Sequence, residues 1–235
     1  MNLSPGQIRA LKVVVFLACL GPVFLLAWKA AHILPWTSDI GFIARGADRW
    51  NLGANPIEVI TRATGKSTLI FLLITLAVTP ARKLLEIGWL VKFRRMFGLF
   101  AFFYATLHFI TYIWLDKFFD LHEMLADIAK RKFITVGFTA FVLLIPLAIT
   151  STKGWIVRLG GKRWHRLHQL SYLIAVLGIF HFLWLVKFDI RRPVKYGIVL
   201  AFLLGYRVVV WAMERARESS EQRAIANSRT SLPQG

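Results

Sequence analysis

Acidic residues and cysteine are both scarce in this chain of 235 residues. There are 12 Asp and Glu side chains against 30 Lys and Arg, which gives a formal net charge of +18. The single cysteine, Cys19, excludes a disulfide framework and a thiolate metal site. The chain also lacks a G-x-G-x-x-G turn, a P-loop and any soluble α/β pattern, so it has no usual site for a dinucleotide.

Apolar and aromatic residues, by contrast, are abundant. Hydrophobic residues make up 57% of the chain, Trp occurs nine times and the mean hydropathy is +0.56, which is too high for a soluble domain of this length. Six apolar runs approach the roughly 17–25 residues that span a bilayer. The sequence therefore predicts an all-α membrane protein, a bundle of six transmembrane helices with both termini on one side. The predicted spans are Val13–Ala31, Ser67–Pro80, Phe97–Leu115, Phe133–Ile149, Leu170–Val186 and Tyr196–Met213.

The second predicted span is the shortest of the six. We expect it to extend into Ile57–Lys66 or to rely on Arg82 and Lys83 reaching to the interface. The spans form one predicted domain, residues 1–215. The polar segment 216–235 is predicted to be a disordered cytoplasmic tail.

Basic residues are spread unevenly between the two sides of the predicted bundle. If the N-terminus is cytoplasmic, the inner segments hold sixteen Lys and Arg and the outer segments hold twelve. The excess favours cytoplasmic N- and C-termini, because basic residues accumulate on the inner side of a membrane. These residues cluster at the ends of spans, so topology and anionic lipid account for the net charge and argue against a nucleic-acid role.

Two histidines lie inside predicted spans, where an unpaired imidazole is costly. His108 is 13 residues beyond Arg95 and His181 is 15 residues beyond Arg166, about 20 and 22 Å along a helix. Both therefore lie in the outer third of the membrane at matched depth. The partner that best suits two neutral imidazoles on facing helices is haem iron. Such a haem would be held without covalent bonds, since the chain has no cysteine pair to attach it.

A third histidine, His168, lies near the inner interface, two residues after Arg166. It is either a further iron ligand or an interfacial residue bonded to a lipid or a carbonyl. The depth-matched residues on the third span are Arg94 and Arg95, which are not ordinary iron ligands, so no second complete bis-histidine site is encoded. On one ideal helix His168 and His181 would also point about 140° apart.

Basic residues surround this inner histidine. Arg94, Arg95 and Arg163, with Lys162 and Arg166, are candidates to hold a flavin phosphate or haem propionates. Their alternative role is to anchor the topology, and the two roles are compatible.

Four stretches of the chain resemble the MsrQ family, the haem-binding membrane subunits of the bacterial periplasmic protein-methionine-sulfoxide reductase system. The stretches are Asn55–Arg82, Arg94–Tyr112, Lys132–Thr152 and Lys162–Lys187. The resemblance covers nearly the whole chain except its polar tail and part of the first outer loop. In combination these stretches are highly specific.

The resemblance implies a bacterial inner-membrane protein with a ferric-reductase-like transmembrane core, haem b and bound flavin mononucleotide (FMN). The family histidines fall on His108, His168 and His181. Electrons would come from quinol or a cytoplasmic flavin reductase. They would leave to a separate periplasmic molybdopterin subunit, which reduces methionine sulfoxide in damaged envelope proteins.

Two rival functions are consistent with parts of the pattern. A stand-alone ferric or quinol-linked transmembrane reductase would use the same core, but no fused FAD/NADPH domain follows the sixth span. A transporter or assembly scaffold would pair its histidines with acids, and few acids lie within the predicted spans. We therefore predict an electron-transfer subunit rather than the site of sulfoxide reduction.

Overall fold

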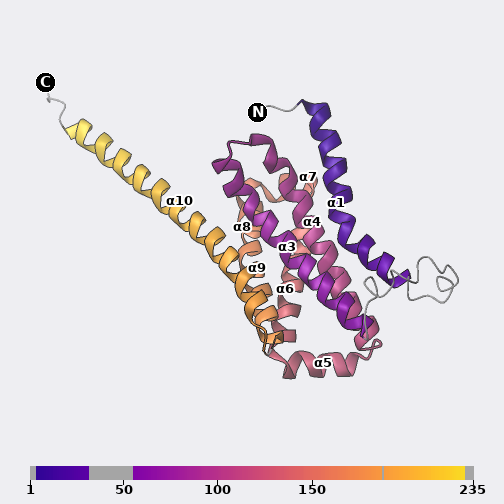
Figure 1. Cartoon of the computed structure of the whole chain (residues 1–235). Coiled ribbons are helices and arrows are strands. Elements are labelled where there is room, and N and C mark those ends of the chain that lie inside the picture. Colours follow the sequence, from indigo (N-terminus) through magenta and orange to yellow (C-terminus); the bar gives the residue numbers. More distant parts are fainter. Residues whose placement is uncertain (1–3, 32–54, 187, 231–235) are drawn as a thin grey trace.

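The apolar runs fold as helices that stand side by side in a bundle (Figure 1). The computed structural model describes residues 4–31, 55–186 and 188–230, and six helical segments in these ranges are long and apolar enough to cross a membrane. This confirms the predicted six-span architecture. The helices that form these spans are α1 (Pro5–Ala31), α3 (Pro56–Leu84), α4 (Val91–Ile110), α6 (Lys132–Ile149), α9 (Leu170–Leu185) and α10 (Arg191–Thr230).

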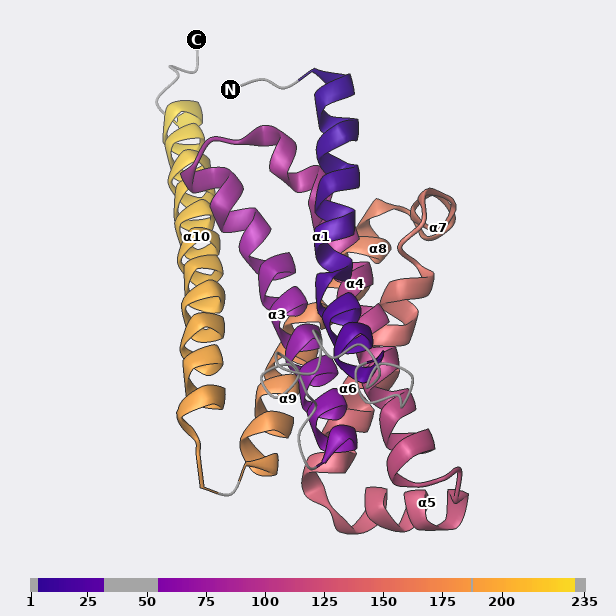
Figure 2. The same ribbon diagram turned by 45° about the vertical axis from the view of Figure 1, so that its right-hand side comes forward.

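Short helices join or extend these spans. They are the 3-10 turn η2 (Gly88–Leu90), the π-helix η3 (Thr111–Asp116), α5 (Leu121–Lys130), α7 (Lys153–Leu159) and α8 (Gly161–His168). The start of α1 and the C-terminal part of α10 lie at the same end of the molecule, here named the terminal end (Figures 1 and 2). Helix α5 lies across the other end, here named the distal end.

The second span is longer than its apolar run. Helix α3 begins at Pro56, where the fixed φ of proline suits the first turn, and the side chain of Asn55 accepts a hydrogen bond from the Glu58 N–H at 3.2 Å. It continues to Leu84, past Arg82. The expected extension into Ile57–Lys66 is therefore confirmed, and the cap explains where it starts.

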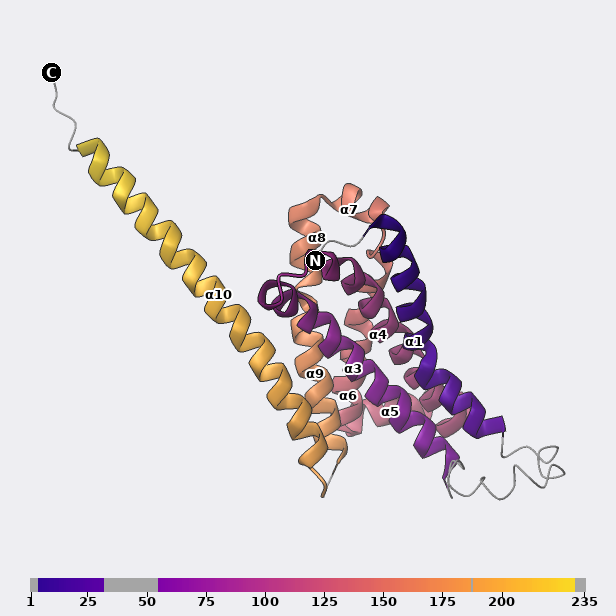
Figure 3. The ribbon, with the colours of Figure 1, turned by 45° about the horizontal axis from the view of Figure 1, so that its top comes forward.

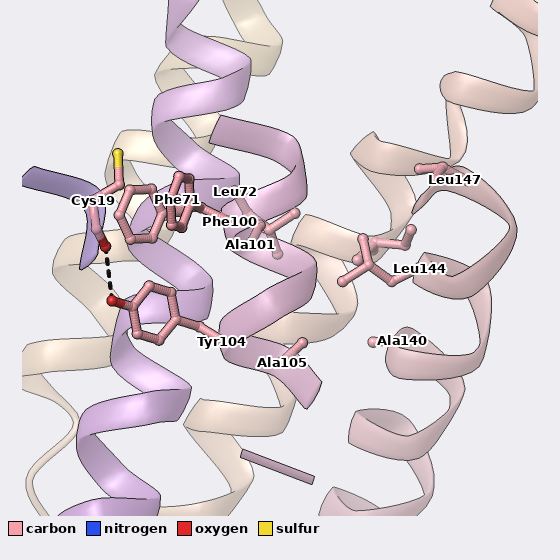
Figure 4. Packing of buried hydrophobic residues seen from close by; sticks show 11 residues of the cluster. Cys19, Phe71, Leu72, Phe100, Ala101, Tyr104, Ala105, Ala140, Leu144 and Leu147 are labelled. Carbon is pink, nitrogen blue, oxygen red and sulfur yellow. Dashed lines mark hydrogen bonds between the residues drawn. The ribbon is translucent and has the colours of Figure 1, made fainter. Parts of the chain in front are cut away.

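Two helix pairs, α3 with α4 and α6 with α9, form the centre of the bundle. A buried cluster joins them, with side chains from α1, α3, α4, α6 and α9, as Figure 4 shows in part. Its aromatic part stacks Phe71 on Tyr104, with ring centres 5.3 Å apart. Many other apolar side chains point away from the protein, as expected of helices that face lipid.

Tyr104 ties α1 to this cluster through a hydrogen-bonded bridge. Its hydroxyl donates to the Cys19 carbonyl at 2.8 Å and accepts from the Val23 N–H at 3.3 Å (Figure 4). A regular helix would join these two backbone groups to each other, and Pro22 lies beside them. The hydroxyl therefore satisfies a turn that the proline disturbs.

The last helix extends beyond the predicted domain boundary. Helix α10 leaves the bundle obliquely (Figures 1 and 3) and remains helical to Thr230, so most of the predicted tail 216–235 is helical here. The local reason is composition. Residues 216–230 include three Ala, three Arg and two Glu, which favour helix, and neither Gly nor Pro.

Helix α5 is held across the distal end by a buried lysine. The Lys117 Nζ lies 2.7 Å from both Asp127 Oδ2 and Glu123 Oε1, and its side chain is only 6% exposed. Arg131 adds a second ion pair to Asp127 at 3.0 Å. The hydrogen bonds to Asp127 and Glu123 raise the pKa of Lys117, and the bond from Lys117 lowers the pKa of Asp127.

Replacing Lys117 by Met is expected to release α5 locally, lowering its stability by about 2 kcal/mol because two charged hydrogen bonds are lost. Faster amide hydrogen exchange over Leu121–Lys130 would show this, with Lys130→Met at the exposed end of α5 as the control. The ion pairs of Lys117 with Asp127 and Glu123 should be intact at neutral pH. The contribution of Asp127 disappears as the pH falls through its lowered pKa, and that of Lys117 as the pH rises through its raised pKa. Equal exchange in the two variants would contradict this role.

Candidate functional site: a pair of facing imidazoles

The structure brings His108 and His181 together from the two central helix pairs. His108 is on α4 and His181 is on α9. Their ring centres are 6.0 Å apart and the ring planes are nearly perpendicular, at 80°. Both rings lie toward the distal end of the bundle, next to the helix ends that approach α5.

A backbone carbonyl fixes the tautomer of each ring. The Nδ1–H of His108 donates to the Thr61 carbonyl on α3 at 2.9 Å, and the Nδ1–H of His181 donates to the Phe133 carbonyl on α6 at 2.7 Å. A carbonyl can only accept, so the proton must be on Nδ1 in both rings. The lone pair of each neutral ring is then on Nε2, which is the arrangement that a metal-bound histidine requires.

A glycine lies one helical turn after each of these carbonyls and makes room for the ring. A Cβ atom on Gly65 would be 3.0 Å from the His108 Cε1, and one on Gly137 would be 2.5 Å from the His181 Nδ1. Both distances are shorter than ordinary contacts between carbon and a ring atom. In each helix pair, one helix therefore carries a carbonyl that accepts from the histidine and, four residues later, a glycine that lets the imidazole ring lie close to the backbone.

This arrangement fits a haem. Two imidazoles bound to one metal through bonds of about 2.0 Å have ring centres about 6 Å apart, and the observed separation is 6.0 Å. Within the described ranges, no group of three or more His, Cys, Asp or Glu side chains could hold a metal ion. His108 and His181 would hold the haem iron, and the haem would supply one-electron chemistry there.

His168 lies apart from this pair. Its Nε2 is 3.0 Å from the Oγ1 of Thr150, the residue that caps the end of α6, and its ring stacks on Trp164 with ring centres 4.0 Å apart. The Trp164 Nε1–H donates to the Thr150 carbonyl at 2.9 Å. A turn at Gln169 separates α8 from α9, and its backbone stays right-handed helical at φ −67° and ψ −21°.

The basic candidates are separated as well. Arg94 is half-buried near the start of α4, whereas Arg95 and Arg163 are exposed. An open pocket of about 430 Å³ lies at the terminal end. It is lined by Gly161, Lys162, His165, Arg166 and Gln169, so two of the predicted basic neighbours line it but Arg163 does not.

Sequence reasoning missed Arg207, which lies within the sixth predicted span. Its Nη2 donates to the Leu76 carbonyl at 2.6 Å and its Nη1 donates to the Tyr172 hydroxyl at 2.9 Å. The signal was available, since a basic residue inside an apolar run marks a functional position by default. Gly65 and Gly137 had no such signal, because only the folded structure shows which glycine faces a histidine ring.

Comparison with known proteins shows which family the chain resembles. The model of the family described as "Ferric reductase like transmembrane component" matches residues 64–179. A relative from Herminiimonas arsenicoxydans is 49% identical over 97% of both chains. Relatives from Azospira oryzae and Rhodospirillum rubrum are 49% and 48% identical over 88% and 84% of this chain, covering 82% and 87% of their own. Each is named "Protein-methionine-sulfoxide reductase heme-binding subunit MsrQ".

The six spans and the family match define a ferric-reductase-like transmembrane protein, a multi-pass membrane protein of bacteria. With relatives this similar over nearly its full length, the chain belongs to the MsrQ family of protein-methionine-sulfoxide reductase haem-binding subunits. The resemblance found in the four sequence stretches is thereby confirmed.

Proposed function

We propose that this chain is the membrane electron-transfer subunit of a methionine-sulfoxide reductase system in the bacterial inner membrane. It would bind haem b through His108 and His181. The observation that supports this most strongly is the 6.0 Å separation of two imidazoles whose Nδ1 protons are both held by carbonyls. The name "heme-binding subunit" carried by its relatives supports the same proposal.

The chemistry follows from the ligand set. A bound haem supplies one-electron exchange between ferric and ferrous iron, and two histidine ligands leave no open position for oxygen chemistry. The protein contributes position and environment. The two carbonyls hold the rings in one tautomer and orientation.

An inner cofactor is required as well. His168 and His181 are 13 residues apart, about 20 Å along the helix, which is long for one electron hop. FMN near the basic pocket, or a haem that uses His168, would divide that distance. The positive charges of Lys162, His165 when protonated, and Arg166 around the pocket support a phosphate-bearing group there. Arg94, Arg95 and Arg163 remain proposed contacts of the flavin or of propionates.

The direction of transfer follows from the proposed orientation. With the terminal end in the cytoplasm, quinol or a flavin reductase would donate there. The paired histidines would then lie near the periplasmic face, where a molybdopterin subunit would accept the electrons and reduce methionine sulfoxide. The subunit names of the relatives support a reductase partner.

The proposal is tested by the visible spectrum of the purified protein, oxidised and reduced, with haem and flavin measured per chain. We expect a low-spin bis-histidine haem b that is reversibly reduced. Colourless protein from haem-replete cells would refute the proposal and would favour a scaffold.

The variant His168→Ala, measured in the same assay, distinguishes the two candidates for the inner cofactor, FMN and a haem that uses His168. A lower haem-to-protein ratio would assign His168 to iron. Full haem with a loss of flavin-dependent reduction would assign the inner position to flavin. Unchanged haem content and unchanged electron transfer would make His168 a structural residue that joins α8 to Thr150 at the end of α6.

A further inference from the structure

The exposed apolar surface of α4 continues beyond the end of that helix. Its large exposed side chains are spaced four or seven residues apart, which places them on one side of a helix. The same spacing leads through the π-helix η3 to the residues that follow it, so that the series is Leu99, Phe103, Ile110, Trp114 and Phe118. Leu99 is 39% exposed and Phe118 is 78% exposed. The apolar surface therefore does not stop at Asp116, where the third candidate span ends.

The chain turns after η3 and presents two phenylalanines on its surface. Phe118 and Phe119 have positive φ angles of 47° and 62°, which are uncommon for residues other than glycine and point to a constraint at this position. Both side chains are exposed. Lys117 beside them is buried and pairs with Glu123 and Asp127. The turn thus separates a cation that faces the protein from two aromatic rings that do not.

Helix α5 has an apolar side that does not face the bundle. Met124 and Asp127 are buried and mark the side that contacts the bundle. Leu121 and Leu125 are exposed, and on an ideal helix they lie roughly 110° around from that side. His122 lies roughly 80° further, on the side turned away from the bundle. Because α5 lies across the distal end (Figures 1 and 2), the two leucines face sideways, along the plane of the membrane.

This apolar side of α5 continues the surface that α4 presents to lipid. Trp114 belongs to a segment long and apolar enough to cross a membrane, and Phe118 follows it by four residues. Aromatic side chains gather where a bilayer meets water, and an amphipathic helix lies there with its apolar side among the acyl chains. A protein that docks from solution would instead meet the side of α5 that carries the exposed His122. The bilayer is therefore the partner that this surface fits.

We propose that residues 114–125 form a membrane-surface anchor that lies in the phospholipid interface at the distal end. The side chains that enter the interface are Trp114, Phe118, Phe119, Leu121 and Leu125. The ion pairs of Lys117 hold the polar side of the anchor against the protein. The anchor would fix the depth of the paired imidazoles, since Trp114 is six residues beyond His108, about 9 Å along a helix. The proposal is independent of the proposed function, because it requires neither haem nor a reductase partner.

The test measures which side of α5 is in lipid. In the full chain with Cys19→Ala, single cysteines introduced by Leu121→Cys, Leu125→Cys or His122→Cys carry a nitroxide spin label. Each protein is placed in nanodiscs of phosphatidylethanolamine and phosphatidylglycerol. Spin relaxation by oxygen, which concentrates in the bilayer, is compared with relaxation by a water-soluble nickel chelate. We expect the ratio of oxygen to nickel accessibility to be several-fold higher at positions 121 and 125 than at position 122.

The three labelled positions form a matched set, because all are exposed residues of one short helix and differ in the direction they face. Phe202→Cys, at an exposed position within the last span, is the lipid reference, and Glu218→Cys, on the polar part of α10, is the water reference. A ratio at positions 121 and 125 no higher than at position 122 would overturn the anchor and would leave this surface to a protein partner. Loss of haem from the protein would contradict the proposed function without changing these ratios.

Discussion

Replacing His108 by Ala is expected to remove nearly all bound haem. Only His181 would then remain to hold the iron, and one histidine does not reproduce the haem affinity of two. The measurement is the haem-to-protein ratio with the reduced spectrum, on protein purified from haem-replete cells. His122→Ala, at an exposed position of α5, is the matched histidine control and should keep full haem.

A replacement by glycine sharpens this result. His108→Gly leaves a space of about the size of an imidazole, so added imidazole should partly restore a low-spin spectrum. If His108→Ala retained the full low-spin spectrum, the pairing of His108 with His181 through iron would be wrong, however close the rings are.

Gly137→Ala is expected to have the second largest effect. The added Cβ would be 2.5 Å from the His181 Nδ1, so the ring must leave the Phe133 carbonyl or the two helices must separate. Either change misplaces an axial ligand, and we expect a loss of haem on the order of tenfold or more. Gly65→Ala should be milder, because its Cβ would be 3.0 Å from the His108 Cε1.

Gly178→Ala is the control for this series. Gly178 is on α9, one turn before the ligand region, and a Cβ there would meet the Leu69 Cδ1 at an ordinary 3.7 Å. The expected order of haem loss is Gly137→Ala, then Gly65→Ala, then Gly178→Ala. If Gly137→Ala and Gly178→Ala bound haem equally well, close seating of His181 would not be required.

Much of the architecture could be predicted because the bilayer restricts what a segment can do. An apolar run must become a helix and a basic cluster marks its end, so six spans followed from composition. The distances of His108 and His181 from the basic residues at the start of their helices then predicted that both lie at the same depth, because the rise of a helix is known. The structure adds what depth alone lacks, namely that α4 and α9 turn these two residues toward each other.

The rest depended on contacts between distant residues. Thr61 and Phe133 act through backbone carbonyls, which carry no signature in the sequence. Proximity along the chain does not show which basic side chains share a surface: Lys162 and Arg166 line the pocket, and Arg163 between them does not. Polar composition likewise does not separate a disordered tail from an exposed helix, and α10 continues past residue 215 to Thr230.

The bond between Arg207 and Leu76 also bears on how the protein is made. A chain is synthesised from its N-terminus, so α3 enters the lipid well before α10 exists. Until then Pro80, which has no N–H, leaves the Leu76 carbonyl four residues before it without its helical donor in a medium that offers no water. Helix α10, which is synthesised after α3, supplies that donor, and a nascent product that stops short of Arg207 would expose the defect.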